Sequence, residues 1–387
     1  MANVLVNENS LTAIGNAIRE KAGSSDTYKP GEMAEAIINL PSGGGSDNFP
    51  EEGMVFTDAC SDIFKNGQWE WALIDYGSRM STKNIKSASS MFNGIKKAKR
   101  IPFSINFKVQ NPGSAQAQSL QSTFQNTSLT ELPDVTGSVG ACNDAVSNSM
   151  YIRAIPESWG DIDLSSTNTN TSQYTGSIRN FFKGCSSLRT IPEAFLKKLY
   201  NAASNATGYM GMFTSCMSLD EVVGLRGINN TMTSNMFSAT FDTCNRLKRI
   251  VFDKENNAPR VQKWAGQTID LTIDVGYNFP KDMLDAYNTG ITLDKEVYDA
   301  ATYQALKNDA DWFATDIAYS RYNHDSAVET INSLPDCSAY LAETSGNYNT
   351  IKFKSAAGSA TDGGSIGNLT EAEIAVATAK GWTVSLV

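Results

Sequence analysis

The strongest constraint on the fold of this chain is an internal repeat. Three ten-residue segments share one phase, with Phe followed by Cys three residues on, Leu six on and an aliphatic residue nine on. They are FKGCSSLRTI from Phe182, FTSCMSLDEV from Phe213 and FDTCNRLKRI from Phe241. Self-similarity at a fixed period is typical of repeat proteins, in which each unit buries its apolar face against its neighbours. The repeat therefore constrains the fold more strongly than any single motif does.

Weaker copies extend the repeat toward the N-terminus. One is FNGIKKAKRI from Phe92, in which Ile95 takes the Cys position, and another is FQNTSLTELP from Phe124, which reaches Leu129 one residue early. A degenerate copy is expected around Val146. The starts at 92, 124, 182, 213 and 241 are separated by 32, 58, 31 and 28 residues, so the longest gap fits two units. The period is therefore about 30 residues.

A period near 30, with Leu and Ile three residues apart, predicts a solenoid in which each unit adds one short strand to a parallel sheet. The segments that precede the repeated Phe, such as 176–181 and 233–241, are predicted to be convex helices. The pattern F-x-x-C-x-x-L-x-x-I-P resembles the BspA-like class of leucine-rich repeats over residues 88–255. The expected fold is therefore α/β, with a leucine-rich-repeat solenoid over residues 49–260. Its three repeated cysteines are expected to stack as small buried residues rather than to form disulfides or bind metal.

The two residues between the repeated Leu and the aliphatic residue are expected to point outward from the concave sheet. In the strong repeats both signs of charge occur there, which suits a polar ligand, a glycan or a protein surface. A solvated sheet face with cross-strand charge pairs explains the same pattern. The candidate ligand face consists of Glu131, Arg153, Arg189, Thr190, Asp220, Glu221, Lys248 and Arg249.

Composition narrows the classes of function. The chain has 387 residues, and its formal net charge of -9 argues against electrostatic binding to nucleic acid or anionic lipid. No apolar run approaches the roughly 18 residues that a membrane-spanning helix needs, so no membrane insertion is expected. The N-terminus shows no basic segment followed by an apolar one, which predicts that a standard signal peptide does not export the chain.

Residues that carry chemistry are sparse. His324 is the only histidine, which excludes metal sites that need two, and none of the six cysteines forms a CxxC pair. His324 and Cys337 could be drawn as a catalytic pair, but no nucleophile motif surrounds this cysteine. His324 precedes a predicted helix, where a structural hydrogen-bonding role fits it better. Spacing singles out no carboxylate pair for glycoside hydrolysis. We therefore expect no enzyme activity, no catalytic residue, no cofactor and no metal.

Residues 1–41 are predicted to form a helical hairpin. Ser10 can cap a first helix that Gly23 ends, and Pro30 begins a second. Residues 42–48 then form a Gly/Ser linker. Two short helices cannot bury both apolar faces alone, so the hairpin either docks on the main body or serves as an attachment or oligomerisation head. Its apolar residues are Leu11, Ile14, Ile18, Met33, Ile37 and Leu40.

The hairpin sequence also carries a resemblance. LTAIGNAIREKAGSSDTYKPGEMAEAIINL, residues 11–40, resembles a short module found at the start of many tail, baseplate and fibre proteins of bacteriophages and prophages. The resemblance implies a virion protein that is assembled in the host cytoplasm and exposed on the particle. Residues 1–41 would then bind other virion proteins, or further copies of the chain.

The C-terminal part first loses the repeat and then regains it. Residues 261–325 are expected to continue irregularly, with a strand at 271–275 and helices at 281–288 and 296–309. Over residues 326–387 the expected order is helix, strand, helix, strand. The last unit, NLTEAEIAVATAKGWTVSLV, resembles the terminal unit of phage leucine-rich-repeat proteins. It predicts a Thr-capped helix with Glu371 and Glu373 in its first turn and Gly381 at its end, whose polar face covers the end of the core.

These observations together predict a bacteriophage virion protein without enzymatic chemistry. Its leucine-rich-repeat body would adhere to host-surface glycan or protein, or to mucus, through many weak contacts. A purely structural tail, baseplate or capsid decoration subunit is the main alternative. A glycan-degrading spike and a bacterial surface adhesin are weaker ones, the latter because a signal peptide is expected for it.

Overall fold

The computed structural model divides the chain into two compact units, Met1–Met54 and Val55–Val387. The structure describes eleven stretches of the chain, which are residues 53–109, 118–164, 178–202, 209–225, 237–244, 246–253, 266, 268–272, 322–340, 348–354 and 369–387. The predicted head at 1–41 and linker at 42–48 lie outside these residues, as do the helices expected at 281–288 and 296–309. The predicted attachment residues Leu11, Ile14, Ile18, Met33, Ile37 and Leu40 lie outside them too.

Short strands and a few helices make up the described residues. The helices are α3 (Glu70–Tyr76), α4 (Glu193–Ala202), α7 (His324–Ser333) and α8 (Glu371–Ala379), with 3-10 turns at Lys65–Gly67, Gly77–Arg79, Glu157–Asp161 and Ser338–Tyr340. The strands are β1 (Met54–Phe56), β2 (Met80–Thr82), β3 (Ile105–Asn106), β4 (Val135–Thr136), β5 (Glu221–Leu225), β6 (Arg249–Phe252), β7 (Thr268–Asp270), β8 (Asn349–Phe353) and β9 (Trp382–Leu386).

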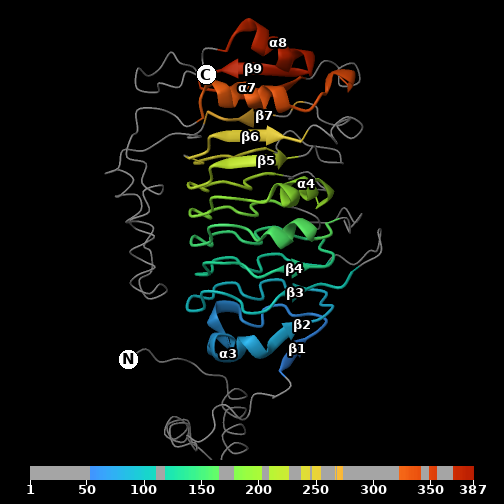
Figure 1. Ribbon diagram of the computed structural model, residues 1–387, viewed down its shortest axis with the longest axis vertical. Helices are drawn as coiled ribbons and strands as arrows, with labels where there is room; N and C mark the ends of the chain where they lie inside the picture. The colour runs from blue at the N-terminus through green and yellow to red at the C-terminus, as the bar shows by residue number, and fades with distance from the viewer. Residues whose placement is uncertain are drawn as a thin grey trace, which may run out of the picture. The chain divides into compact units, whose positions relative to one another are not determined.

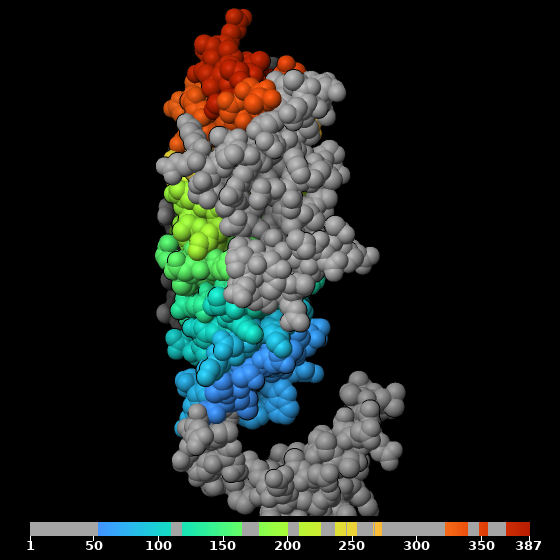
Figure 2. Space-filling model, turned by 90° about the vertical axis from the view of Figure 1, so that its right-hand side faces the viewer, coloured from blue at the N-terminus to red at the C-terminus, as the bar shows by residue number. Residues whose placement is uncertain are grey.

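The strands pair with neighbours in chain order. The pairs β3–β4, β5–β6, β7–β8 and β8–β9 are all parallel, as expected for a chain that advances by one unit at a time. Within the second unit, Figure 1 shows the levels following one another from β2 through β5 and β6 to β9, and Figure 2 shows the same succession of bands on the surface. Each level therefore contacts chiefly the one before it and the one after it.

A second backbone ladder links seven turns along one side of the described residues. In each of the first six turns the N–H of the central residue donates to the carbonyl just before the next central residue, at N···O distances of 2.8 to 3.0 Å. Phe64 donates to Met91 O, so the ladder includes one turn that precedes the first repeat seen in the sequence. Val146 donates to Phe181 O, which confirms the degenerate copy around Val146. The central residues are Phe64, Phe92, Phe124, Val146, Phe182, Phe213 and Phe241.

Every one of these turns uses two left-handed residues. They lie two positions before and two positions after the central residue, with φ between 52° and 79°. Asn, Asp, Ser and Gly fill most of these positions because they adopt this conformation at least cost. The first column is Asp62, Ser90, Ser122, Asp144, Asn180, Gly211 and Ala239, and the second is Asn66, Gly94, Asn126, Asn148, Gly184, Ser215 and Thr243.

The convex helices expected at 176–181 and 233–241 are wrong for the residues that the structure describes. Residues 178–185 and 237–244 form turns instead. An α-helix needs right-handed dihedrals at every position, and the left-handed residues Asn180 and Ala239 interrupt such a run. The turn satisfies its backbone groups through bonds to adjacent turns, so no helix is needed.

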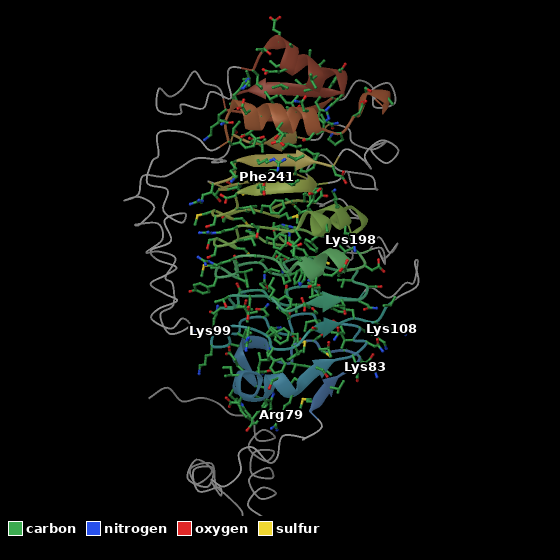
Figure 3. All side chains as sticks on the ribbon, viewed as in Figure 1. Arg79, Lys83, Lys99, Lys108, Lys198 and Phe241 are labelled. Carbon is green, nitrogen blue, oxygen red and sulfur yellow. The ribbon has the colours of Figure 1, made fainter. Side chains whose placement is uncertain are left out.

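Stacked aromatic rings fill the interior beneath these turns. Phe64 stacks on Phe92 and Phe92 on Phe124, with ring centroids 5.4 and 5.7 Å apart. Phe182, Phe213 and Phe241 continue the column at 6.1 and 5.7 Å, and Figure 3 shows Phe241 inside the body. The sequence period therefore becomes a continuous aromatic core.

Trp159 fills the interior at the level where Val146 replaces the aromatic ring. It is fully buried and contacts Phe124, Phe181 and Phe195, while its indole N–H donates to Pro133 O at 2.9 Å. A larger side chain from another part of the repeat thus compensates for the smaller valine. The copy at Val146 looks degenerate in sequence because its aromatic residue comes from position 159 and not from the repeated Phe position.

The repeated cysteines lie in register, as expected, and each also makes a hydrogen bond. Cys185 donates to Val146 O, Cys216 to Phe182 O and Cys244 to Phe213 O, each at 3.1 Å. In each case the acceptor is the central residue of the preceding turn. Ser149 donates to Phe124 O in the same way, so a small donor makes this bond in four of the seven turns. The six cysteines of the chain are all buried and free.

The C-terminal part has a different construction. Its sheet places β8 between β7 and β9, and β9 is the last strand of the order expected over residues 326–387. The predicted cap of α8 is confirmed, because Thr370 and Glu373 form a reciprocal capping box and Gly381 has a φ of 81°. The sequence predicted a polar exposed face for α8, but this face is not polar throughout. Ala372 and Ala375 are exposed, and Ala377 is the only buried residue of the helix.

Helix α7 forms hydrogen bonds with the backbone of β6. The hydroxyl of Thr330 donates to Ile250 O at 2.7 Å, and Ser333 Oγ accepts from Phe252 N–H at 3.0 Å. Two hydroxyls of one helix thus replace the backbone groups that a further strand would offer. Residues about eighty positions apart in sequence are joined at this point.

Candidate functional site

The backbone joins four of the eight residues of the predicted ligand face. Arg189 N–H donates to Arg153 O at 2.8 Å, Asp220 N–H to Arg189 O at 3.4 Å, and Lys248 N–H to Asp220 O at 2.8 Å. These four residues therefore occupy consecutive levels. Glu131, Thr190 and Lys248 are exposed, whereas the others are partly buried.

Two of the predicted residues are engaged in an ion-pair network. Arg249 and Glu221 are register partners in β6 and β5, and Arg249 Nη1 lies 3.2 Å from Glu221 Oε2. Arg249 also holds both carboxylate oxygens of Glu329 on α7, with its Nη2 2.7 Å from Oε1 and its Nε 2.9 Å from Oε2. These hydrogen bonds lower the pKa of Glu329 and raise that of Arg249. This end of the face therefore serves the attachment of α7, and its charged groups already have partners.

A second site lies beside α3, near the start of the second unit. A cleft of about 480 Å³ opens there, and its lining includes Asn66, Gly67, Glu70, Trp71, Ile74 and Lys97. Trp71 and Ile74 are 57% and 52% exposed, which is unusual for large apolar side chains on one short helix. Trp69 is 61% exposed, and its ring centroid lies 6.3 Å from that of Trp71.

A buried carboxylate forms part of the cleft wall. Glu70 is only 5% exposed, and its Oε1 accepts hydrogen bonds from Lys97 N–H at 2.5 Å and Ala98 N–H at 2.8 Å. The described residues donate no hydrogen bond to its Oε2, which lies next to Gly67. A Cβ on that glycine would approach Oε2 to 3.2 Å and narrow the cleft. The segment thus reverses the usual burial of charged and apolar side chains, since Glu70 is buried and the Trp residues on either side of it are exposed.

Sequence reasoning did not single out this cleft. The available signal was W-E-W at 69–71, one residue after a turn of the form D-x-F-x-N-G. That turn departs from the F-x-x-C phase because Gly67 takes the Cys position, so the sequence pattern does not include the turn around Phe64. The side chains of α3 meet Lys97 and Gly94 of the following turn only because the two levels stack.

His324 and Cys337 lie in different surroundings. The ring nitrogens of His324 lie 3.2 Å from Asp325 Oδ1 and 3.2 Å from Glu373 Oε2, so it joins the N-termini of α7 and α8. Its hydrogen bond with Asp325, followed by that with Glu373, raises the pKa of His324. Burial raises the pKa of the Cys337 thiol to about 12, and that thiol donates to Pro335 O. The arrangement suits structural roles for both residues.

The remaining thiols have no activated environment. Burial raises the pKa of Cys142 and of Cys185 to about 12 and that of Cys60 to about 11. A thiolate nucleophile requires the opposite shift. Within the described stretches, no group of three or more His, Cys, Asp or Glu residues could hold a metal ion, and no helix is long and apolar enough to span a membrane.

Comparison with known proteins gives no match to this chain among protein-family models, curated proteins or solved structures.

Proposed function

We propose that this chain is a bacteriophage virion protein whose leucine-rich-repeat body is displayed on the particle for adhesion to the host surface or to mucus. Residues 11–40 support the virion part of the proposal through their resemblance to phage attachment modules. Under this proposal residues 1–41 bind other virion proteins, and the body binds rather than reacts.

The observation that carries the adhesion part is the row of charged residues on consecutive levels, of which Lys248 is exposed and the others are partly exposed. Arg153, Arg189, Asp220 and Lys248 repeat at the spacing of the backbone ladder, so an extended polar ligand can meet one level after another. Many copies on one particle would multiply weak contacts into strong attachment. Arg249 pairs with Glu329 of α7, so the part of the row that can bind a ligand ends before the level that α7 contacts.

A structural subunit is the second candidate function, and one feature favours it. Among the described residues β9 pairs with β8 alone, and Leu386 and Val387 at the C-terminal end of this strand are 39% and 67% exposed. An unpaired edge with apolar ends can receive a further strand from another protein. A tail or capsid decoration subunit would use this end for packing.

Locating the chain in the intact particle by electron microscopy tests both candidates. Adhesion predicts that the chain lies outside the particle and that added full-length protein competes with adsorption to host cells. A chain buried between other virion proteins, with no competition from the free protein, would favour the structural candidate. Removal of residues 1–41 should abolish incorporation, and normal incorporation would contradict the attachment role.

A further inference from the structure

We propose that the cleft beside α3 is a binding site for a neutral oligosaccharide. The inference rests on the proposed adhesion function and adds to the row of charged residues a second recognition site, in the region of Glu70 and Trp71. Three features of the cleft carry the argument, namely an exposed aromatic platform, a buried carboxylate and a rim with both signs of charge.

The platform suits the apolar face of a sugar ring. A pyranose presents aliphatic C–H groups on its faces and hydroxyls around its edge, so it packs flat against an indole while its hydroxyls stay available. Trp71 lines the cleft with much of its surface open, and Trp69 stands beside it at an interplanar angle of 53°. Two rings inclined in this way can contact successive units of a bent glycan chain.

The carboxylate supplies the polar contact. Glu70 is held in place by two backbone N–H groups on Oε1, which leaves Oε2 to accept a hydrogen bond from a ligand. An apolar protein surface pressed over the cleft would bury this carboxylate oxygen without a donor, at a large cost. Sugar hydroxyls provide the donors, so the occupant that fits best is a polyhydroxyl compound.

The rim argues for a ligand without net charge. Asp75, Lys96 and Lys97 all line the cleft, and all three are exposed. An anionic glycan would meet Glu70 and Asp75, and a cationic ligand would meet the two lysines. A neutral hexose or N-acetylhexosamine can hydrogen-bond to either kind of group.

The backbone at this site supports a role for the projecting tryptophans. Trp69 has a φ of 54°, which is rare for so bulky a residue. Its carbonyl accepts from Ala72 and Leu73, so the first turn of α3 fixes this conformation while the ring points to solvent. Strain of this kind is concentrated at functional sites.

Saturation-transfer NMR and calorimetry on the full-length protein test the site. The probes are short neutral oligosaccharides of glucose, galactose, mannose, N-acetylglucosamine and N-acetylgalactosamine. We expect saturable binding of at least one probe, and we expect Trp71→Ala to weaken it at least about tenfold, because the stacking surface is lost. Trp71 is exposed, so its replacement should leave the unfolding transition unchanged.

The matched control is Tyr348→Ala, which removes another exposed aromatic side chain outside the cleft. It should bind the probe as the unaltered protein does. Equal affinity of the Trp71→Ala variant, or no saturable binding of any probe, would overturn the inference.

Adsorption competition separates this inference from the proposed function. If the unaltered protein and the Trp71→Ala variant compete equally with the particle, adhesion stands and the cleft is not the site through which the protein adheres. If the protein binds oligosaccharide in the cleft without competing, the site stands and the adhesion proposal fails.

Discussion

The turns between residues 58 and 253 and the C-terminal part from residue 322 stabilise their levels in different ways. In the first region, columns of equivalent residues bond from one turn to the next, and the interior is a stack of aromatic rings. In the second, two capped helices and hydroxyl contacts such as that of Thr330 hold the sheet. Successive repeats can thus be held together by the same contacts at equivalent positions, whereas the C-terminal part uses contacts that occur only once. Four predictions test this contrast.

The largest effect is expected for Phe182→Ala in the aromatic column. Removing a fully buried ring should cost about 3–5 kcal/mol, since the neighbouring rings cannot close the cavity. Phe182→Leu should cost much less. Urea denaturation measures the loss, and hydrogen exchange should locate it in the adjacent turns rather than in β8 and β9. Uniform acceleration of exchange across both regions would show that they form one cooperative unit.

Thr330→Val should destabilise the junction between α7 and β6 by about 2 kcal/mol. The change preserves shape but leaves Ile250 O without its donor and removes the contact with the Tyr322 hydroxyl. The control is Thr378→Val on α8, whose exposed hydroxyl bonds only within its own helix. If both variants unfold at the same urea concentration, the hydrogen bonds of α7 with β6 contribute little.

Ala239→Gly should stabilise the protein by about 1 kcal/mol. Ala239 is exposed and has a φ of 53°, a conformation that costs an L-residue energy and glycine almost none. Ala145→Gly provides the opposite case, because Ala145 precedes a central residue outside the left-handed columns. It should destabilise by about 0.5–1 kcal/mol. Thermal unfolding measures both, and destabilisation by Ala239→Gly would contradict the role given to the columns.

The smallest effect concerns the ion pairs of His324. Its pKa is raised above the ordinary value of 6.5, so its contribution to stability is complete below that pH and is lost as pH rises through the folded pKa. The pKa of Glu373 is lowered from 4.5, so its contribution is present above that pH and is lost as pH falls. The pair therefore stabilises the contact between α7 and α8 most between about pH 4.5 and 6.5.

NMR titration of the single histidine measures this contribution. Asp325→Asn and Glu373→Gln should each lower the pKa of His324, whereas Glu371→Gln in the same turn of α8 should not. Glutamine retains the capping box with Thr370, so helix loss does not confuse the result. An unchanged pKa in both test variants would remove the charge interaction.

The sequence by itself determined the period, the register and the cap. The Phe/Cys phase predicted that Cys185, Cys216 and Cys244 would stack, and the T-x-x-E pattern at 370–373 predicted the start of α8. These features depend on residues close together in the chain, or on one pattern repeated, and both are visible without coordinates.

The tertiary structure decided the rest, because stacking brings together residues that no local pattern relates. Only the ladder shows that Asn180 and Ala239 are left-handed and that turns replace the expected helices. Only the approach of neighbouring levels places the backbone of Lys97 on Glu70 and opens the cleft beside Trp71. A hydrophobic period fixes which side chains point inward, but contacts between levels depend on the path of the whole backbone.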